Sequence, residues 1–203
     1  MKEKVIIVGA GDYAISVIHS IDESKYDIKG FLDDNMEGEY LRFPIIGKSL
    51  DALDHPEEYK YFISIANIDA RKKWFKRLED ANLELITVID KTANVATESK
   101  IGKGTYIGRN AVVGCYAVIG CNCMVYTGAI VEYHCYIGNH VRISPGAVVN
   151  GHVDIEDEVY IGANACIVQD KRVRKHAVVG AGAVVISDVD IDKTVVGVPA
   201  RII

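Results

Sequence analysis

Branched apolar residues recur at every sixth position from Val95 to Val185, and this spacing is the strongest regularity in the chain. Each of the sixteen positions in the series is Val or Ile. If roughly one residue in seven is Val or Ile, chance does not produce such a run. The next residue is often Gly, and the fifth residue of the six is mostly small or Val. The pattern predicts a solenoid of short flat strands, with one inward-pointing branched side chain per hexad and compact residues near the corners.

These hexads resemble the left-handed parallel β-helix of hexapeptide-repeat acyltransferases, in which three hexads make one triangular coil. The resemblance covers residues 95 to about 187 without an insertion. The ending Val196-Gly197-Val198-Pro199-Ala200-Arg201 is also similar to the G-x-P-A-[KR] close of that family. The resemblance implies a homotrimer with active sites in the clefts between neighbouring copies, and acetyl-CoA as cosubstrate.

The first ninety residues follow a different pattern. A buried-strand run at 4–8 ends in Gly9-Ala10-Gly11-Asp12, and apolar residues then recur at helical spacing over 13–21. We expect further strands at 28–32, 61–66 and 85–89 and a helix over 71–81, where Arg71-Lys72-Lys73 forms a solvated face. The sequence therefore predicts a small Rossmann-like α/β domain over residues 1–90 and a β-helix with its C-terminal tail over 91–203.

Ligands of parallel α/β sheets bind at the carboxyl ends of the strands, where Gly9 to Gly11, Asp33 to Asp34 and Asn67 are expected. A glycine turn before a helix suits a phosphate group. Ala14 stands where the third glycine of GxGxxG belongs, which argues against a dinucleotide. The alternative for Asp33 and Asp34 is that they only cap a turn.

A domain of this layout fused to a hexapeptide helix resembles the bacterial nucleotide-linked amino-sugar N-acetyltransferases and the sialic-acid O-acetyltransferase group. The resemblance implies that the glycine turn receives the diphosphate, and that the segments after the second and third strands hold the base or ribose. Asp12-Tyr13 departs from the usual Gly-His, so an acid faces the phosphate region. The implied substrate-binding residues are Gly9, Ala10, Gly11, Asp33, Asp34, Ile65, Ala66 and Asn67.

The expected catalytic stretch is Val131-Glu132-Tyr133-His134-Cys135. Family members typically carry the base, a histidine, third in this hexad, whereas here Tyr133 is third and His134 fourth. Histidine has a pKa near 6.5 and suits proton transfer from an amine, while a phenol near 10 does not. Three alternatives follow: His134 reaches in as the base, Tyr133 positions a substrate whose amine arrives neutral, or the site binds without catalysis. Glu132 and Tyr133 are expected to line the sugar end.

Residues 18 apart stack on successive coils of such a helix, so His134 is expected above His152, with Tyr116 on the coil before and Asp170 on the coil after. Histidines are also common polar fillers of the exposed fourth position. The acetyl-CoA contacts implied by the resemblance are Arg142, Gly151, Gly180, Ala181 and Gly182.

Charge and composition limit the classes of binding partner that we expect. The net charge is −5 and no block of Lys or Arg is long, so we expect no nucleic-acid or anionic-membrane partner. No segment approaches the roughly 20 apolar residues of a membrane helix, and the start lacks a signal-peptide pattern, which predicts a cytoplasmic protein without membrane insertion. The five cysteines are odd in number and are expected to be small buried fillers.

Together these features predict an acetyl-CoA-dependent N-acetyltransferase, which acts on the amino group of a UDP- or dTDP-linked amino-deoxysugar for surface glycan biosynthesis. The alternatives are O-acetylation of a sugar such as sialic acid, or a non-catalytic sugar-nucleotide-binding homologue. A metal-dependent hydratase of the γ-carbonic-anhydrase type is a further rival, since His140 and His176 imitate part of its ligand set. Residue 181 is Ala where its third ligand would fall, so no metal is expected.

Overall fold

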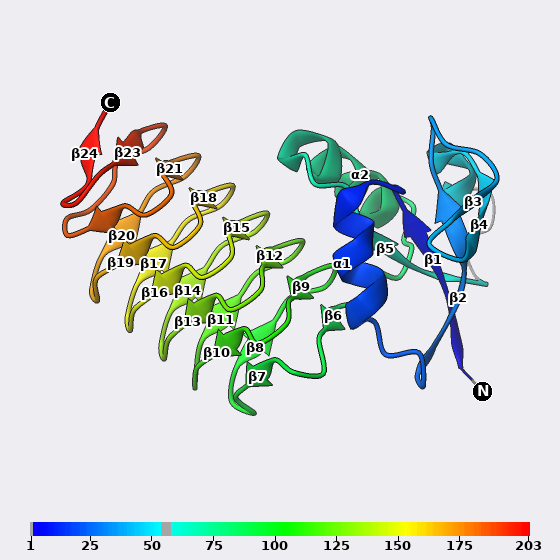
Figure 1. Ribbon diagram of the computed structural model, residues 1–203, viewed down its shortest axis with the longest axis horizontal. Helices are drawn as coiled ribbons and strands as arrows, with labels where there is room; N and C mark the ends of the chain where they lie inside the picture. The colour runs from blue at the N-terminus through cyan, green and yellow to red at the C-terminus, as the bar shows by residue number, and fades with distance from the viewer. Residues whose placement is uncertain (1, 54–57) are drawn as a thin grey trace. The chain divides into compact units, whose positions relative to one another are not determined.

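The computed structural model describes residues 2–53 and 58–203, and the chain divides into two compact units, Met1–Ile89 and Asp90–Ile203. The first unit is an α/β domain on a five-stranded sheet with the order β3-β4-β2-β1-β5 (Figure 1). β1, β2, β4 and β5 are parallel, and β3 pairs antiparallel with β4 at one edge. Its elements are β1 (Glu3–Val8), α1 (Asp12–Ser20), β2 (Tyr26–Leu32), β3 (Glu39–Tyr40), β4 (Phe43–Gly47), the 3₁₀ turn η1 (Ser49–Leu53), β5 (Lys60–Ile63), α2 (Ile68–Asp80) and β6 (Val88–Ile89).

The central position of β1 follows from its composition. Val5 to Val8 are all buried, as expected for a parallel strand with both faces covered. The expected strands near 4–8, 28–32 and 61–66 and both helices are present. The strand expected at 85–89 is reduced to a bridge between Tyr61 and Leu85 and the short β6.

Arg71 corrects the expectation of a fully solvated helix face. Its side chain is only 1% exposed, and it donates from Nη1 to the carbonyl oxygens of Ile65 and Ala66 at 3.3 and 3.2 Å. The charge is buried because these carbonyls need donors in the loop after β5. Arg71 therefore holds the segment between β5 and α2.

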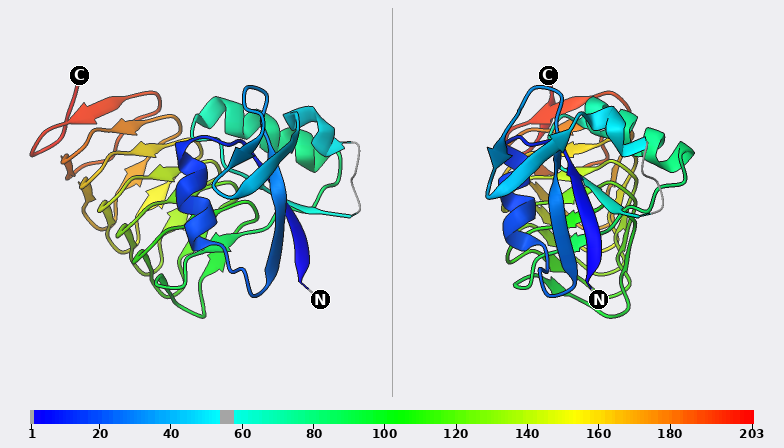
Figure 2. Two further views of the ribbon diagram at one scale, coloured as in Figure 1. Left: turned by 45° about the vertical axis from the view of Figure 1, so that its right-hand side comes forward. Right: turned by 90° about the vertical axis from the view of Figure 1, so that its right-hand side faces the viewer.

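The second unit is a left-handed parallel β-helix, and each of its short strands between Asn94 and Val185 ends on a Val or Ile of the hexad series. Figure 2 shows its coils stacked in chain order, from green to red. The strands are β7 (Asn94–Val95), β8 (Lys100–Ile101), β9 (Tyr106–Ile107), β10 (Val112–Val113), β11 (Val118–Ile119), β12 (Met124–Val125), β13 (Ile130–Val131), β14 (Tyr136–Ile137), β15 (Arg142–Ile143), β16 (Val148–Val149), β17 (Asp154–Ile155), β18 (Tyr160–Ile161), β19 (Cys166–Ile167), β20 (Arg172–Val173), β21 (Val178–Val179), β22 (Val184–Val185), β23 (Thr194–Val196) and β24 (Arg201–Ile202).

Residues 18 apart pair on neighbouring coils, as in Val113 with Val131 and Val131 with Val149. The strands form three faces. The first face holds β7, β10, β13, β16, β19 and β22, and the second holds β8, β11, β14, β17 and β20. The third holds β9, β12, β15, β18, β21, β23 and β24. The Val and Ile series fills the interior, where most of its members are 0 to 1% exposed, because the period of six aims every one inward.

The fourth position of every hexad from 104 to 182 turns the chain at a corner with a positive φ. Asn, Asp and His tolerate this left-handed conformation better than other side chains, and Gly adopts it freely. This backbone requirement explains why polar residues and glycines recur there. The positions are Gly104, Asn110, Tyr116, Asn122, Gly128, His134, His140, Gly146, His152, Glu158, Asn164, Asp170, His176 and Gly182.

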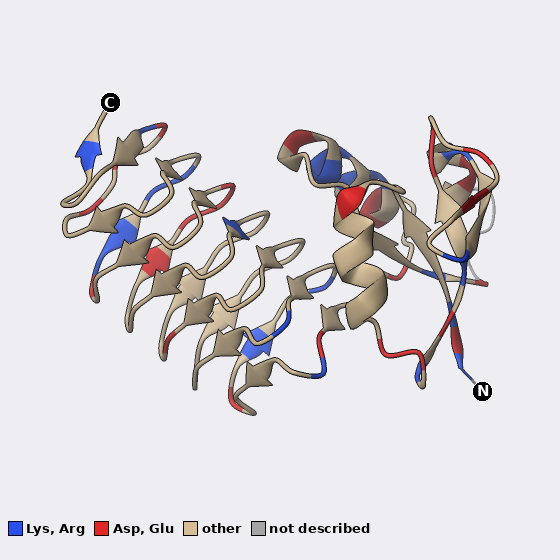
Figure 3. Ribbon diagram, in the orientation of Figure 1, with Lys and Arg blue, Asp and Glu red and all other residues tan. Residues whose placement is uncertain are grey.

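Acidic and basic residues are interspersed over both units (Figure 3), so no strand row of the β-helix forms a continuous basic stripe. Neither α1 nor α2, the helices in the described part of the chain, has the length and apolar character needed to cross a bilayer.

Candidate active site

The glycine turn lies at the carboxyl edge of β1, between the ends of β2 and β5. Gly9 has a φ of 98°, and a Cβ on it would meet Ile65 Cγ1 at 2.7 Å, so the fold itself requires glycine there. Gly11 differs, because its φ of −94° suits any residue and a Cβ would meet nothing within 4 Å. The open space before Gly11 and the start of α1 can admit a ligand.

Asp33 braces this turn. Its carboxylate accepts the Ala10 N–H at 2.8 Å and the N–H groups of Asn35 and Met36 at 2.8 and 3.0 Å. Burial raises the pKa of the Asp33 carboxyl, but these three donors outweigh burial and leave the pKa below its ordinary value. Asp34 accepts the Ser49 N–H at 2.9 Å. Both acids therefore act as loop caps, and Asp33 occupies one amide of the glycine turn.

The segment after β5 completes this edge. Ile65 packs against Gly9, Ala66 is exposed, and Asn67 caps α2 by accepting the Ala70 N–H at 2.9 Å. The sequence did not single out Tyr40, whose hydroxyl donates to the Gly11 carbonyl at 3.4 Å from β3. All eight expected substrate-binding residues thus lie on three neighbouring loops of the first unit.

The second candidate region is one corner of the β-helix, between the first and second faces, which we call the histidine corner: Tyr116, Tyr133, His134 and His152. Tyr133 is third in its hexad and 44% exposed. His134 is fourth, at the turn, with a φ of 54°. The pairing of Val131 with Val113 and of Ile137 with Ile119 fixes this register, so the structure keeps the one-residue offset that the sequence indicated.

Aromatic rings cover both faces of the His134 imidazole. The Tyr116 ring lies 5.0 Å away at 14° and the His152 ring 5.1 Å away at 11°. The Tyr133 ring stands edge-on to His134 and His152, at 6.1 and 5.4 Å. The parallel arrangement leaves the edge of the imidazole, which carries its nitrogens, as the part available for chemistry.

Gly151 explains where the Tyr133 ring lies. A Cβ on this buried glycine would meet the Tyr133 ring at 2.7 Å, so the ring rests against the glycine backbone of the next coil. Gly151 therefore makes room for Tyr133, a role that the sequence did not reveal.

Glu132 and Cys135 flank Tyr133 and His134 in the sequence. Within the described residues, no hydrogen bond joins the Glu132 carboxylate to His134. Cys135 is buried and donates from Sγ to the Asn150 carbonyl at 3.0 Å. Burial raises the pKa of the Cys135 thiol to about 11, so it is a neutral filler at pH 7. Cys123 is buried likewise, whereas Cys115 is exposed and Cys121 and Cys166 are partly so, which corrects the expectation of burial for these three.

The expected acetyl-CoA contacts fall in different places on one copy of the chain. Gly151 lies at the histidine corner, whereas Gly180, Ala181 and Gly182 lie between β21 and β22, at the corner of the third and first faces. Arg142 lies on the third face, with its guanidinium between the Tyr126 and Tyr160 rings at 5.0 and 5.2 Å. A single copy does not bring these residues together.

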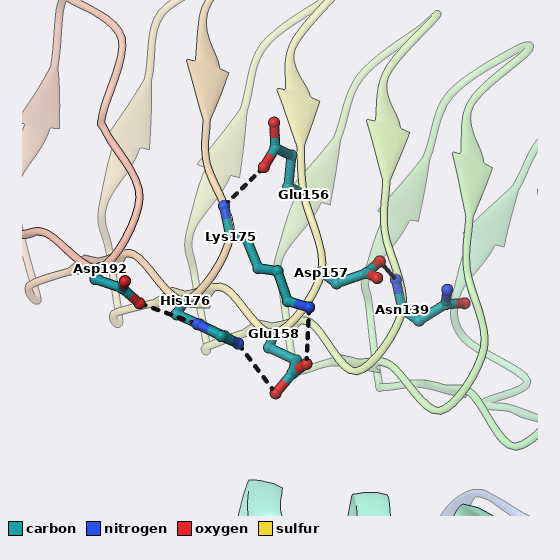
Figure 4. Close-up of polar contacts among 7 residues, drawn as sticks. All are labelled: Asn139, Glu156, Asp157, Glu158, Lys175, His176 and Asp192. Atoms are coloured by element: carbon teal, nitrogen blue, oxygen red, sulfur yellow. Dashed lines mark hydrogen bonds and ion pairs between the residues drawn. The ribbon is translucent and has the colours of Figure 1, made fainter.

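A metal centre has no support in the described residues, which contain no group of three or more His, Cys, Asp or Glu placed to hold an ion. His176 instead lies between Glu158 and Asp192, with Nε2 to Oε2 at 3.4 Å and Nδ1 to Oδ1 at 3.0 Å (Figure 4). This corner is an ion-pair network that joins coils.

Family models match both units. The PglD N-terminal domain matches residues 4–78, and the bacterial transferase hexapeptide (six repeats) matches residues 116–151 and 134–169. A curated relative, the uncharacterized protein L142 of Acanthamoeba polyphaga mimivirus, is 32% identical over 103 residues. The chain spans only 20% of that protein's length.

Solved structures match the whole chain. The acetyltransferase domain of PglB from Neisseria gonorrhoeae, also solved with acetyl coenzyme A, is 30% identical with a TM-score of 0.93, and the match covers 100% of both chains. WeeI from Acinetobacter baumannii is 28% identical over 100% of both, with a TM-score of 0.86. PerB from Caulobacter crescentus, solved with CoA and GDP-perosamine, is 25% identical over 98% of this chain and 96% of that one, with a TM-score of 0.92.

Proposed function

Because this chain belongs to the hexapeptide-repeat acetyltransferases that carry a PglD-type N-terminal domain, we propose that it transfers the acetyl group of acetyl-CoA to the amino group of a nucleotide-linked amino-deoxysugar. The observation that carries the proposal is the match of both units together, over the full length of an acetyltransferase domain solved with acetyl coenzyme A. PerB binds a GDP-linked sugar, so GDP joins UDP and dTDP as a candidate nucleotide.

The first unit binds the nucleotide in this proposal. The free space before Gly11 and the N-terminus of α1 suit the diphosphate, and the loops around Asp34 and Ala66 suit the base and ribose. Asp33 contributes by fixing the turn through Ala10. Asp12 is exposed in the first turn of α1, where its negative charge weakens phosphate binding and so sets a limit on affinity.

His134 is the base at the histidine corner. It accepts a proton from the sugar ammonium, and the neutral amine then attacks the thioester carbonyl. When the carbon–sulfur bond breaks, the thiolate of CoA leaves and takes up the second proton, which the nitrogen loses as the amide forms, so the products are the amide and CoA. Tyr133 and Glu132 line the sugar side of this corner.

The proposal includes a homotrimer. Gly151 and the stretch Gly180 to Gly182 lie at different corners of one copy, so a shared acetyl-CoA site requires corners of neighbouring copies. The mass in solution, measured by light scattering, should be three times the 22.2 kDa of one chain. We also place the protein in the cytoplasm, in surface glycan synthesis, since its five free cysteines suit a reducing compartment.

The direct test is thiol release from acetyl-CoA with a panel of UDP-, dTDP- and GDP-linked sugars that carry an amino group at C3 or C4. Reaction with none of them refutes the proposal. Nucleotide-free sialic acid as acceptor, together with thermal stabilisation by nucleotides alone, separates N-acetylation from O-acetylation and from binding without catalysis.

His134→Ala should lower kcat/KM roughly 10²- to 10⁴-fold, because it removes the general base. The matched control is His140→Ala, since His140 is also fourth in its hexad with a φ of 60° but lies at the next corner. Equal losses of kcat/KM in the two variants would show that His134 only stabilises the fold and is not the base.

A further inference from the structure

One column of the β-helix carries a ring on each of three successive coils. Tyr116, His134 and His152 occupy the same fourth position with φ values of 60°, 54° and 59°. The common backbone conformation sends the three side chains out of the corner in parallel. Their rings are consequently 5.0 and 5.1 Å apart, with interplanar angles of 14° and 11°.

The other two corners do not repeat this arrangement. The column of Asn122, His140, Glu158 and His176 is linked by polar contacts, such as Asn122 Nδ2 to His140 Nδ1 at 2.9 Å. Figure 4 shows the contact of His176 with Glu158 in the same column. The remaining column holds Asn110, Gly128, Gly146, Asn164 and Gly182, none of which carries a ring. Stacked rings are therefore a property of the histidine corner and not of the solenoid.

Stacking takes the place of a hydrogen bond in orienting His134. In the described residues, no carboxylate or amide side chain bonds to either ring nitrogen of His134, although a base usually needs a partner that fixes its ring. The Tyr116 and His152 rings restrict the imidazole from both faces, and the Tyr133 edge restricts it from the side.

We propose that Tyr116 and His152 are positioning residues, which hold the His134 ring by stacking on its two faces so that a ring nitrogen faces the amine. The inference rests on the proposed function, in which His134 is the base. It adds a specific requirement: the flanking positions need planar rings, and the imidazole nitrogens of His152 and the hydroxyl of Tyr116 are dispensable.

The kinetic test compares ring-keeping with ring-removing variants at each position. Tyr116→Phe and His152→Phe should keep kcat within about twofold, because the flat ring remains. Tyr116→Leu and His152→Leu should lower kcat roughly ten- to hundredfold with KM little changed, because a loosened base is misplaced in the complex. Tyr136→Leu is the control, since Tyr136 is an exposed tyrosine of β14 outside the stack.

A second measurement needs no substrate. In protein labelled with ¹³C-histidine, the His134 ring protons should resonate upfield because of the Tyr116 and His152 ring currents. They should move downfield in both Leu variants, and remain closer to the wild-type position in the Phe variants.

The outcomes separate the two proposals. If the wild type acetylates no sugar in the panel, the proposed function fails, while the resonances still decide whether the stack holds His134. The positioning role is overturned if the Phe variants lose as much kcat as the Leu variants, if an active enzyme tolerates both Leu variants, or if the His134 resonances do not move.

Discussion

Gly9 and Gly11 differ in what the fold requires of them. Gly9→Ala should unfold at lower urea concentration, because the new Cβ meets Ile65 and the φ of 98° is strained. Gly11→Ala should keep the wild-type free energy of unfolding within about 0.5 kcal/mol, since its Cβ enters open space. It should still weaken nucleotide binding at least tenfold, because the same space is the proposed site of the diphosphate. Urea unfolding and calorimetric titration with UDP, dTDP and GDP measure both effects. Unchanged binding in Gly11→Ala would place the nucleotide elsewhere.

Tyr133 offers a gain-of-function prediction. Adding Tyr133→His to the His134→Ala variant should raise kcat/KM at least tenfold above that of His134→Ala alone. The reason is that an imidazole with a pKa near 6.5 then occupies the third position against Gly151. Tyr136→His in the same background is the control and should recover nothing. A double variant as inactive as His134→Ala would show that the third position does not face the amine.

At the residue scale, the sequence identified the residues of the histidine corner but not the contacts that their side chains make. It predicted that His134 is fourth in its hexad and shares a column with Tyr116 and His152. It did not predict that the rings are parallel, or that Tyr133 lies against Gly151. These features depend on the side-chain rotamers and on the absence of a Cβ at Gly151. Both matter only once residues 18 apart in the sequence are paired on neighbouring coils.

At the element scale, the hexad series makes the stability of the β-helix predictable. Ile155→Ala should cost about 2–5 kcal/mol, because the side chain is 0% exposed and fills one coil's interior. Ile186→Ala should change stability by no more than about 0.5 kcal/mol, since Ile186 is 47% exposed and outside the series. Urea unfolding compares the two variants, and similar losses would contradict the inward register.

The elements of the first unit were less predictable. The run of Val5 to Val8 identifies β1 by itself, whereas β3 and β4 contain only exposed and half-buried residues and their sequences show no strong alternation of apolar and polar residues. Arg71 looked like part of a solvated basic face, but it is buried because the carbonyls of Ile65 and Ala66 require a donor. Such loop contacts follow no short sequence period.

At the scale of the whole molecule, the two ligands should protect different units. In hydrogen–deuterium exchange, saturating nucleotide should slow exchange around residues 9–13 and 33–36, and CoA should slow it only in the hexads, because each ligand stabilises the region that binds it. The control is adenosine, which lacks a diphosphate and should protect neither. Protection of the hexads alone by nucleotide would contradict the assignment of the first unit.

The sequence by itself determined the β-helix, its register and the position of His134 as fourth in its hexad, after Tyr133. A period of six fixes which side chains point inward and which residues lie where the chain turns a corner. It also placed the glycine turn and Asp33 at one sheet edge. Only the tertiary structure decided that Asp33 caps the Ala10 amide, that Gly11 faces open space, and that three rings stack around His134. Those contacts join residues distant along the chain, and they depend on the exact approach of backbones and ring planes.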